Sequence, residues 1–139
     1  MSSHLFLLDT SVWIHLNRRN PPGRILHRAD SLIAANLAAF NQVIRGEILI
    51  GCRTEREYLA NNTQIGALLE LPLHQPAWDA AANLGFALRR KGLTVALPDL
   101  LIAASALEHD AIVVHADADF DNIARHSDLR VESYANFPA

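Results

Sequence analysis

Four acidic residues are of the type, and in the places, that could bind a divalent metal ion: Asp9, Glu47, Asp99 and Asp117. Carboxylate oxygens suit Mg²⁺ or Mn²⁺, whereas Zn²⁺ prefers histidine or cysteine. The seven histidines form no H-x-x-x-H pair, and Cys52 is the only cysteine. Like charges gathered at one site repel each other, and a cation compensates them. Because such a site acts most naturally on phosphates, we expect phosphodiester hydrolysis.

Each acid also has a simpler structural interpretation when it is taken alone. Asp9 and Asp99 could be helix N-caps, and Asp117 could be a turn residue. Glu47 is harder to explain in this way, because its helical neighbours at i−4, i−3 and i+3 are all apolar. A charge on an apolar helix stripe needs a partner when it is buried. Together, the four acids favour one shared acidic pocket.

The elements that must position these acids follow from the hydrophobic pattern. Short apolar or extended segments are expected at 5–8, 37–40, 71–73, 111–114 and 129–131, with helical patterns between them. This alternation predicts a three-layer α/β/α sandwich with a parallel central sheet. Ligands of such sheets bind outside the carboxyl ends of the strands. Asp9 and Asp117 each follow an expected strand and therefore belong at that edge.

Local signals predict where several helices begin and end. Asp9 opens a run of three good N-cap residues, and Thr54 with Glu57 has the spacing of a capping box. Gly92 is expected to end the helix that runs from about residue 76.

Composition limits the classes of function. The chain has 139 residues, 50% of them hydrophobic, and a net charge of −3, which fits one domain over residues 1–139 and excludes a basic surface all round. The apolar run near the start is four residues long, too short for a signal peptide or a membrane span. We therefore expect a cytoplasmic protein that is not bound to a membrane. The densest basic run, Arg89, Arg90 and Lys91, could contact RNA or could only complement a helix dipole.

Four segments of the chain, 7–14, 43–51, 98–107 and 113–124, each contain one of the four acids. In sequence and in order they resemble the motifs of PIN-domain nucleases, specifically the VapC-type toxins of bacterial toxin–antitoxin pairs. The likeness covers nearly the whole chain. One motif alone would be weak evidence, whereas four in order are strong.

The resemblance implies a mainly parallel five-stranded sheet, homodimerisation, and endoribonuclease activity with Mg²⁺ or Mn²⁺. It transfers metal binding to Asp9, Glu47, Asp99 and Asp117, with Asp119 as an alternative or further ligand. Thr10 or Ser11 would support the site. His115 stands where many members have threonine or serine, so the fourth motif departs from the family pattern.

The resemblance also implies partners: an RNA substrate, such as transfer or ribosomal RNA, and a small DNA-binding antitoxin whose C-terminal segment wraps the toxin. We expect an amphipathic antitoxin helix to use an apolar wall made of Tyr58, Leu59, Ile65, Leu68 and Leu69.

Alternative functions are a catalytically inactive PIN-like scaffold and a housekeeping PIN nuclease without an antitoxin. A calcium-binding EF-hand at 117–128 is disfavoured, because Asn122 stands where that loop needs glycine. A haloacid-dehalogenase-type phosphatase would need a second aspartate at the position of Ser11.

Overall fold

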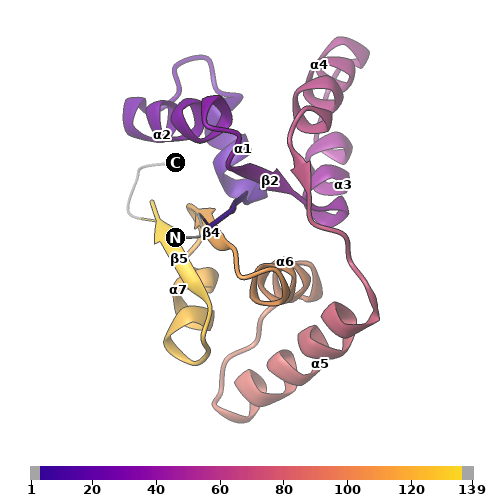
Figure 1. The fold of residues 1–139 in the computed structure, drawn as a ribbon, viewed down its shortest axis with the longest axis vertical. Helices are drawn as coiled ribbons and strands as arrows, with labels where there is room; N and C mark the ends of the chain where they lie inside the picture. Colours follow the sequence, from indigo (N-terminus) through magenta and orange to yellow (C-terminus); the bar gives the residue numbers. More distant parts are fainter. Residues whose placement is uncertain (1–3, 136–139) are drawn as a thin grey trace.

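A five-stranded parallel sheet forms the centre of the computed structural model, which describes residues 4–135 (Figure 1). The strands are β1 (Phe6–Leu8), β2 (Ala38–Phe40), β3 (Leu69–Glu70), β4 (Ile112–His115) and β5 (Arg130–Ser133). They lie in the order β3-β2-β1-β4-β5, and every neighbouring pair is parallel. In the register, Leu7 of β1 lies between Ala39 and Val113. The predicted parallel sheet is confirmed.

Seven helices within the described residues connect these strands. They are α1 (Thr10–Leu16), α2 (Gly23–Ala34), α3 (Gln42–Ile50), α4 (Glu55–Gly66), α5 (Gln75–Arg90), α6 (Leu97–Glu108) and α7 (Ala118–Arg125). Helices α1 to α4 lie on one side of the sheet and α5 to α7 on the other (Figure 1). Right-handed crossovers require this division, because the chain moves outward from β1 to β3 and then crosses back to β4. The predicted three-layer α/β/α sandwich is confirmed.

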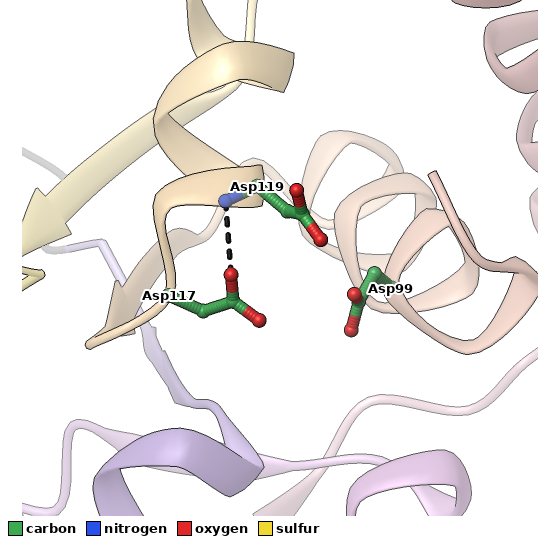
Figure 2. Close-up of side chains that lie close together, drawn as sticks. All are labelled: Asp99, Asp117 and Asp119. Carbon is green, nitrogen blue, oxygen red and sulfur yellow. Dashed lines mark hydrogen bonds between the residues drawn. The ribbon is translucent and has the colours of Figure 1, made fainter. Parts of the chain in front are cut away.

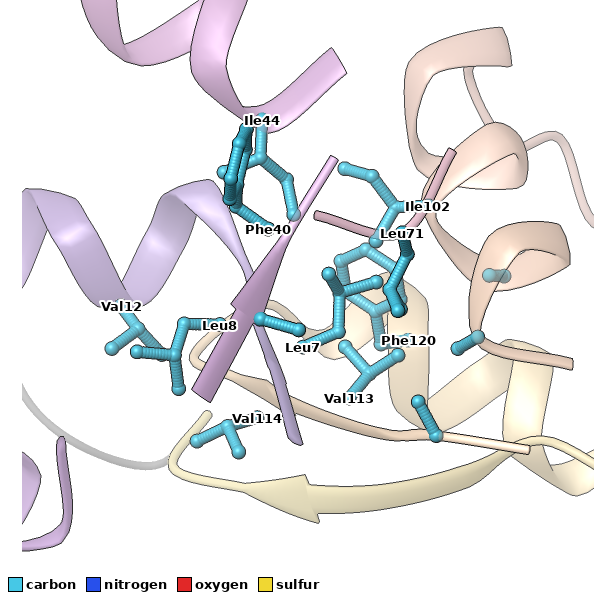
Figure 3. Close-up of a cluster of buried hydrophobic side chains, with 14 of the residues drawn as sticks. Leu7, Leu8, Val12, Phe40, Ile44, Leu71, Ile102, Val113, Val114 and Phe120 are labelled. Carbon is cyan, nitrogen blue, oxygen red and sulfur yellow. The ribbon is translucent and has the colours of Figure 1, made fainter. Parts of the chain in front are cut away.

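The core lies between the sheet and both helix layers (Figure 3). Side chains of the two central strands are buried on both faces, as the continuous apolar runs indicate: Leu7, Leu8, Val113 and Val114 are all 2% exposed or less. Helix α6 is buried over most of its length and packs against α5. This packing fixes the first turn of α6 relative to the central strands.

The predicted helix signals occur with one change. Thr54 caps α4 by accepting the N–H of Glu57 at 3.1 Å. The Glu57 carboxylate accepts the N–H of Arg53 at 2.9 Å, whereas a capping box would use the N–H of Thr54, one residue later. Gly92 follows α5 with a φ of +84°, a conformation that glycine adopts without steric cost. Its predicted role in ending that helix is confirmed.

Two predicted boundaries are wrong. The extended segment at 71–73 is not the third strand, which is formed two residues earlier by Leu69 and Glu70. Pro72 lacks the N–H that a strand ladder needs, so the pairing ends with the bond from the Leu71 N–H to the Phe40 carbonyl at 2.8 Å. Helix α6 begins at Leu97 rather than near residue 100, with Pro98 in its first turn. None of the helices in residues 4–135 is long and apolar enough to cross a membrane.

Candidate functional site

The candidate site lies at the carboxyl ends of β1 and β4, where the chain direction across the sheet switches. Strand β1 has β2 on one side and β4 on the other. Asp9 directly follows β1, and its N–H donates to the carbonyl of Val114 at 3.0 Å. Asp117 comes two residues after β4. The sheet topology therefore brings together two acids that are 108 positions apart.

Asp9 is nearly buried and is held by Ser11. As the N-cap of α1, its Oδ2 accepts the Ser11 N–H at 3.0 Å and the Ser11 hydroxyl at 2.5 Å. The same hydroxyl accepts the N–H of Ala116 at 2.9 Å, so it ties the end of β1 to the turn after β4. The other carboxylate oxygen of Asp9, Oδ1, is buried and has no hydrogen-bond partner within the described residues.

Glu47 enters the site from the middle of α3. It is half-buried, and the Thr10 hydroxyl donates to its Oε1 at 2.7 Å. The expectation that Glu47 sits on a buried apolar stripe is only partly right, because Ile50, one of the neighbours that defined the stripe, is 87% exposed. Thr10 supplies the partner that the sequence left open.

Asp99, Asp117 and Asp119 form the tightest part of the site, with their carboxylates pointing toward one another (Figure 2). Each offers one oxygen within 4.8 Å of the others. Asp117 is the N-cap of α7 and accepts the Asp119 N–H at 2.9 Å. Asp99 is the third residue of α6, whose N-cap is Ala96, so the N-cap interpretation of Asp99 is wrong.

The pKa values show that the five carboxylates share one electrostatic environment. Burial raises the pKa of Asp99 to about 7, and the charges of Asp9, Asp117, Glu47 and Asp119 contribute to the same rise. Burial also raises the pKa of Asp9 to about 6, against the opposing hydrogen bonds from Ser11. No arginine or lysine among residues 4–135 lies within ion-pair distance of any of the five. The site therefore carries negative charge that the described part of the chain does not neutralise.

The donor set fits a hard divalent cation. In three carboxylates, one oxygen is fixed by a hydrogen bond and the other has no hydrogen bond within residues 4–135: Asp9, Glu47 and Asp117. Oxygen ligands at close range with excess negative charge are what Mg²⁺ and Mn²⁺ prefer. The buried, unpartnered Oδ1 of Asp9 is an additional sign that an atom from outside the chain completes the site.

The basic run predicted as an RNA contact ends the helix that precedes α6. Arg89 and Arg90 form the last turn of α5, and Lys91 is its C-cap. The six residues 91–96 connect α5 to the helix that carries Asp99, so both lie at the same end of this helical hairpin. The guanidinium of Arg90 lies 5.7 Å from the ring centroid of Phe86.

Two neighbouring hollows lie along α1. The first, about 540 Å³, is lined by residues of α1, α3 and α4 and the segment between the latter two, and includes Glu47. The second, about 440 Å³, lies between α1, α2 and the end of α4. Both are lined by Trp13 and Asn17, so they adjoin each other, and together they are called the groove along α1.

Of the expected apolar wall, only Leu68 lines the groove. Ile65 belongs to the core with no exposed surface, so its assignment to the wall is wrong. Tyr58, Leu59 and Leu69 are exposed outside both hollows. The apolar wall of the second hollow instead includes Leu16, Leu26 and Ile33.

Sequence reasoning missed the contacts that support the turn after β4. His115 was noted only as a departure from the family pattern, whereas in the fold it contacts Asp121, which accepts a hydrogen bond from Ser133 behind Asp117. A polar residue ending a strand of otherwise apolar residues was the available signal for His115. Nothing in the local sequence connects Ser133 with this turn, because β5 meets it only in the folded sheet.

Comparison with known proteins assigns the family. The sequence profile of the PIN domain matches residues 6–126. Ribonuclease VapC11 of Mycobacterium tuberculosis is 35% identical over 136 residues, which cover 94% of this chain and 99% of that protein. Such a relative does not favour an inactive scaffold.

Solved structures share the fold. VapBC2 from Rickettsia felis, bound to a DNA fragment from its promoter, matches with a TM-score of 0.78 at 20% identity over 94% of this chain and 98% of that one. VapC20 of Mycobacterium tuberculosis, a sarcin–ricin loop cleaving toxin, matches with a TM-score of 0.64 at 17% identity over 84% and 93%. From the family match and the identity to VapC11, we conclude that the chain belongs to the PIN domain family and, within it, to the VapC ribonucleases.

Proposed function

We propose that this VapC ribonuclease is a divalent-metal-dependent endoribonuclease, with residues 1–139 as one PIN domain, and that it acts as the toxin of a toxin–antitoxin pair. The observation that carries the proposal is the convergence of five carboxylates without a basic partner in the described chain: Asp9, Glu47, Asp99, Asp117 and Asp119. Ribonuclease names among the relatives support RNA as the substrate.

The chain's own residues prepare the site before any cation or RNA binds. Ser11 fixes Oδ2 of Asp9, Thr10 fixes one oxygen of Glu47, and the Asp119 N–H fixes one oxygen of Asp117. Each bond orients the remaining oxygen, so less reorganisation is needed on binding. A Mg²⁺ or Mn²⁺ ion held there would supply charge neutralisation at the scissile phosphate and a lower pKa for attacking water.

The test is RNA cleavage by the purified full chain with Mg²⁺ or Mn²⁺ and with excess EDTA. Total RNA, transfer RNA and a sarcin–ricin loop hairpin are suitable substrates, the hairpin because a structural neighbour cleaves that loop. We expect cleavage with metal, none with EDTA, and recovery when metal is added back. Sequencing the new 5′ ends locates the site. Undiminished cleavage in EDTA contradicts metal dependence, and cleavage at random positions contradicts a single RNA target.

We further propose that a small DNA-binding antitoxin occupies the groove along α1. The second hollow offers an apolar wall for an amphipathic helix, and the first leads from it to Glu47. An arginine carried by that helix could pair bidentately with the acids. The Rickettsia felis neighbour is a VapBC2 assembly on promoter DNA, which supports a DNA-binding partner.

The antitoxin proposal predicts a short open reading frame next to this one. Expression of the chain alone should arrest growth, and co-expression of its neighbour should restore it. Leu26→Glu in the second hollow should weaken binding of the partner, whereas Leu59→Glu on exposed α4 outside both hollows should not. Harmless expression of the folded chain alone contradicts the toxin role and favours a housekeeping nuclease.

Homodimerisation in the cytoplasm completes the proposal. Trp78 and Phe86 of α5 are 47% and 65% exposed, and Leu97, the first residue of α6, is 51% exposed. Apolar surface of this kind supports a self-association face. Light scattering during gel filtration should give twice the chain mass, and Phe86→Glu should shift it toward the monomer. A monomeric wild type contradicts the dimer.

A further inference from the structure

His115 ends β4 and lies two residues before Asp117, with no exposed surface. Burying an imidazole costs free energy unless its nitrogen atoms have polar partners. A leucine or phenylalanine would fill the same space without that cost. The contacts of the two nitrogens therefore indicate why a histidine occupies this position.

The two ring nitrogens face two different groups. Nδ1 accepts the backbone N–H of Asp117 at 3.1 Å, so the hydrogen of the neutral ring is on Nε2. Nε2 lies 3.3 Å from Oδ1 of Asp121, a polar approach without the alignment of a full hydrogen bond. Burial lowers the pKa of the imidazole, which agrees with a neutral ring.

These contacts continue to the edge strand. The Ser133 hydroxyl of β5 donates to Oδ2 of Asp121 at 3.0 Å. The N–H of Tyr134 donates to the carbonyl of His115 at 2.7 Å. The Phe120 ring packs against the imidazole, with 5.2 Å between the two ring centroids. The imidazole thus connects the backbone of Asp117 with α7 and, through α7, with β5.

We propose that His115 is a positioning residue for the metal-binding turn: it holds the Asp117 backbone against Asp121 and Ser133 and so aims the carboxylates of Asp117 and Asp119 at Asp99. This inference rests on the proposed metal-dependent function. Outer partners of metal ligands commonly change metal affinity about 10- to 100-fold when they are removed. The imidazole contacts the backbone of a ligand rather than the metal, so its loss weakens binding without removing an oxygen donor.

The test separates the polar contacts of His115 from its packing. His115→Phe keeps a ring against Phe120 but removes both nitrogens. His115→Asn provides an oxygen acceptor at the same number of bonds from the backbone as Nδ1. His15→Phe is the matched control, because His15 is also buried and its Nδ1 has no hydrogen-bond partner within residues 4–135. Mn²⁺ binding to the full chain is measured by calorimetry, with melting in EDTA as the folding control.

We expect His115→Phe to raise the Kd for Mn²⁺ about 10- to 100-fold. His115→Asn should restore affinity to within about threefold of wild type, and His15→Phe should leave it unchanged. Half-maximal RNA cleavage by His115→Phe should need correspondingly more Mn²⁺, while the rate at saturating Mn²⁺ recovers. Asp121→Ala, at a half-buried position, should weaken Mn²⁺ binding about three- to tenfold and tests the same contacts if His115→Phe does not fold.

Two results would overturn the positioning role. One is that folded His115→Phe binds Mn²⁺ within twofold of wild type. If His115→Phe does not fold, the same result for Asp121→Ala overturns the role. The other is an equal loss of affinity in His115→Phe and His115→Asn, which would indicate packing alone. Asp99→Asn distinguishes failure of the proposed function: if it binds Mn²⁺ as well as wild type does, the metal site itself is wrong, whatever His115 does.

Discussion

The two ends of β4 carry acidic residues in opposite electrostatic surroundings. Before the strand, Asp110 pairs with Arg130 of β5 and lies 3.6 Å from Nδ1 of His4. After the strand, Asp117 lies beside Asp99 and Asp119, and no basic side chain of residues 4–135 pairs with any of the three. Strand β4 therefore has a neutralised acid before its amino end and concentrated negative charge after its carboxyl end.

This difference separates charges that the chain compensates from charges that it leaves for a ligand. An exposed ion pair contributes little to stability, and its loss is tolerated. Several carboxylates in one pocket oppose folding when nothing compensates them. Substitutions at the two ends of β4 should therefore differ in their effects on activity, and even in the sign of their effects on stability.

The largest difference is expected in RNA cleavage. Asp99→Asn should lower the rate about 10²-fold or more, because it removes a charged oxygen ligand from the centre of the acidic cluster. Asp110→Asn removes the same charge at the other end of β4 and should leave the rate unchanged. Initial rates with saturating Mn²⁺ are compared at equal concentrations of folded protein. Equal rates for Asp99→Asn and wild type would contradict the proposed difference between the two ends of β4.

The next effect concerns the pH dependence of unfolding without metal. The pKa of Asp9 is about 6 in the folded protein, against 3.8 for an unperturbed aspartate, so between these values the folded protein binds more protons than the unfolded chain. The unfolding free energy must therefore fall as pH rises from about 4 to 6, by about 3 kcal/mol from Asp9. Asp99, with a pKa of about 7, extends the loss in the same direction to higher pH.

Asp9→Asn isolates this contribution, because it removes the titrating group while asparagine can still accept from Ser11. Its stability relative to wild type, measured by urea unfolding in EDTA, should increase from about pH 4 to about pH 7. A constant difference in unfolding free energy across this pH range would show that the Asp9 carboxyl does not cause the pH dependence.

The sequence predicted this site unevenly, for physical reasons. Asp9 could be placed because an apolar strand followed by a cap residue is a local signal, and parallel strands align their carboxyl ends. The start of α6 could not be placed well, because Pro98 fits both a loop and a first helical turn. That ambiguity made Asp99 look like a possible N-cap, whereas Ala96 occupies the cap.

Contacts between distant elements were beyond the sequence pattern. Thr10 and Glu47 are 37 positions apart, and their hydrogen bond depends on how α1 packs against α3. Ile65 was assigned to a partner surface because helical spacing shows an apolar stripe but not what covers it. In the fold Ile65 faces the core, and the apolar wall of the groove comes mostly from other helices.

A third effect is stabilisation by metal. A ligand that binds only the folded protein stabilises it by about 2.7 kcal/mol when present at about 100 times its Kd. Mn²⁺ should therefore raise the melting temperature of wild type and of Asp110→Asn by similar amounts. Asp99→Asn should respond much less at the same concentration. Scanning calorimetry measures the melting temperatures of all three proteins. An equal shift for Asp99→Asn would show that Mn²⁺ binds outside this cluster.

The smallest effect tests the paired end of β4. Asp110 has a φ of 52°, in the left-handed region that asparagine tolerates well, so Asp110→Asn removes the charge without backbone strain. Loss of the exposed pair with Arg130 should lower the unfolding free energy by about 0.5 kcal/mol at low salt. In about 1 M salt the difference should nearly disappear, because exposed charges are screened. Asp9→Asn in EDTA at about pH 7 should shift the unfolding free energy in the opposite direction, since it removes a desolvated charge. If both substitutions destabilise the metal-free protein equally, Asp9 serves mainly as a helix cap and the contrast between the two ends of β4 is wrong.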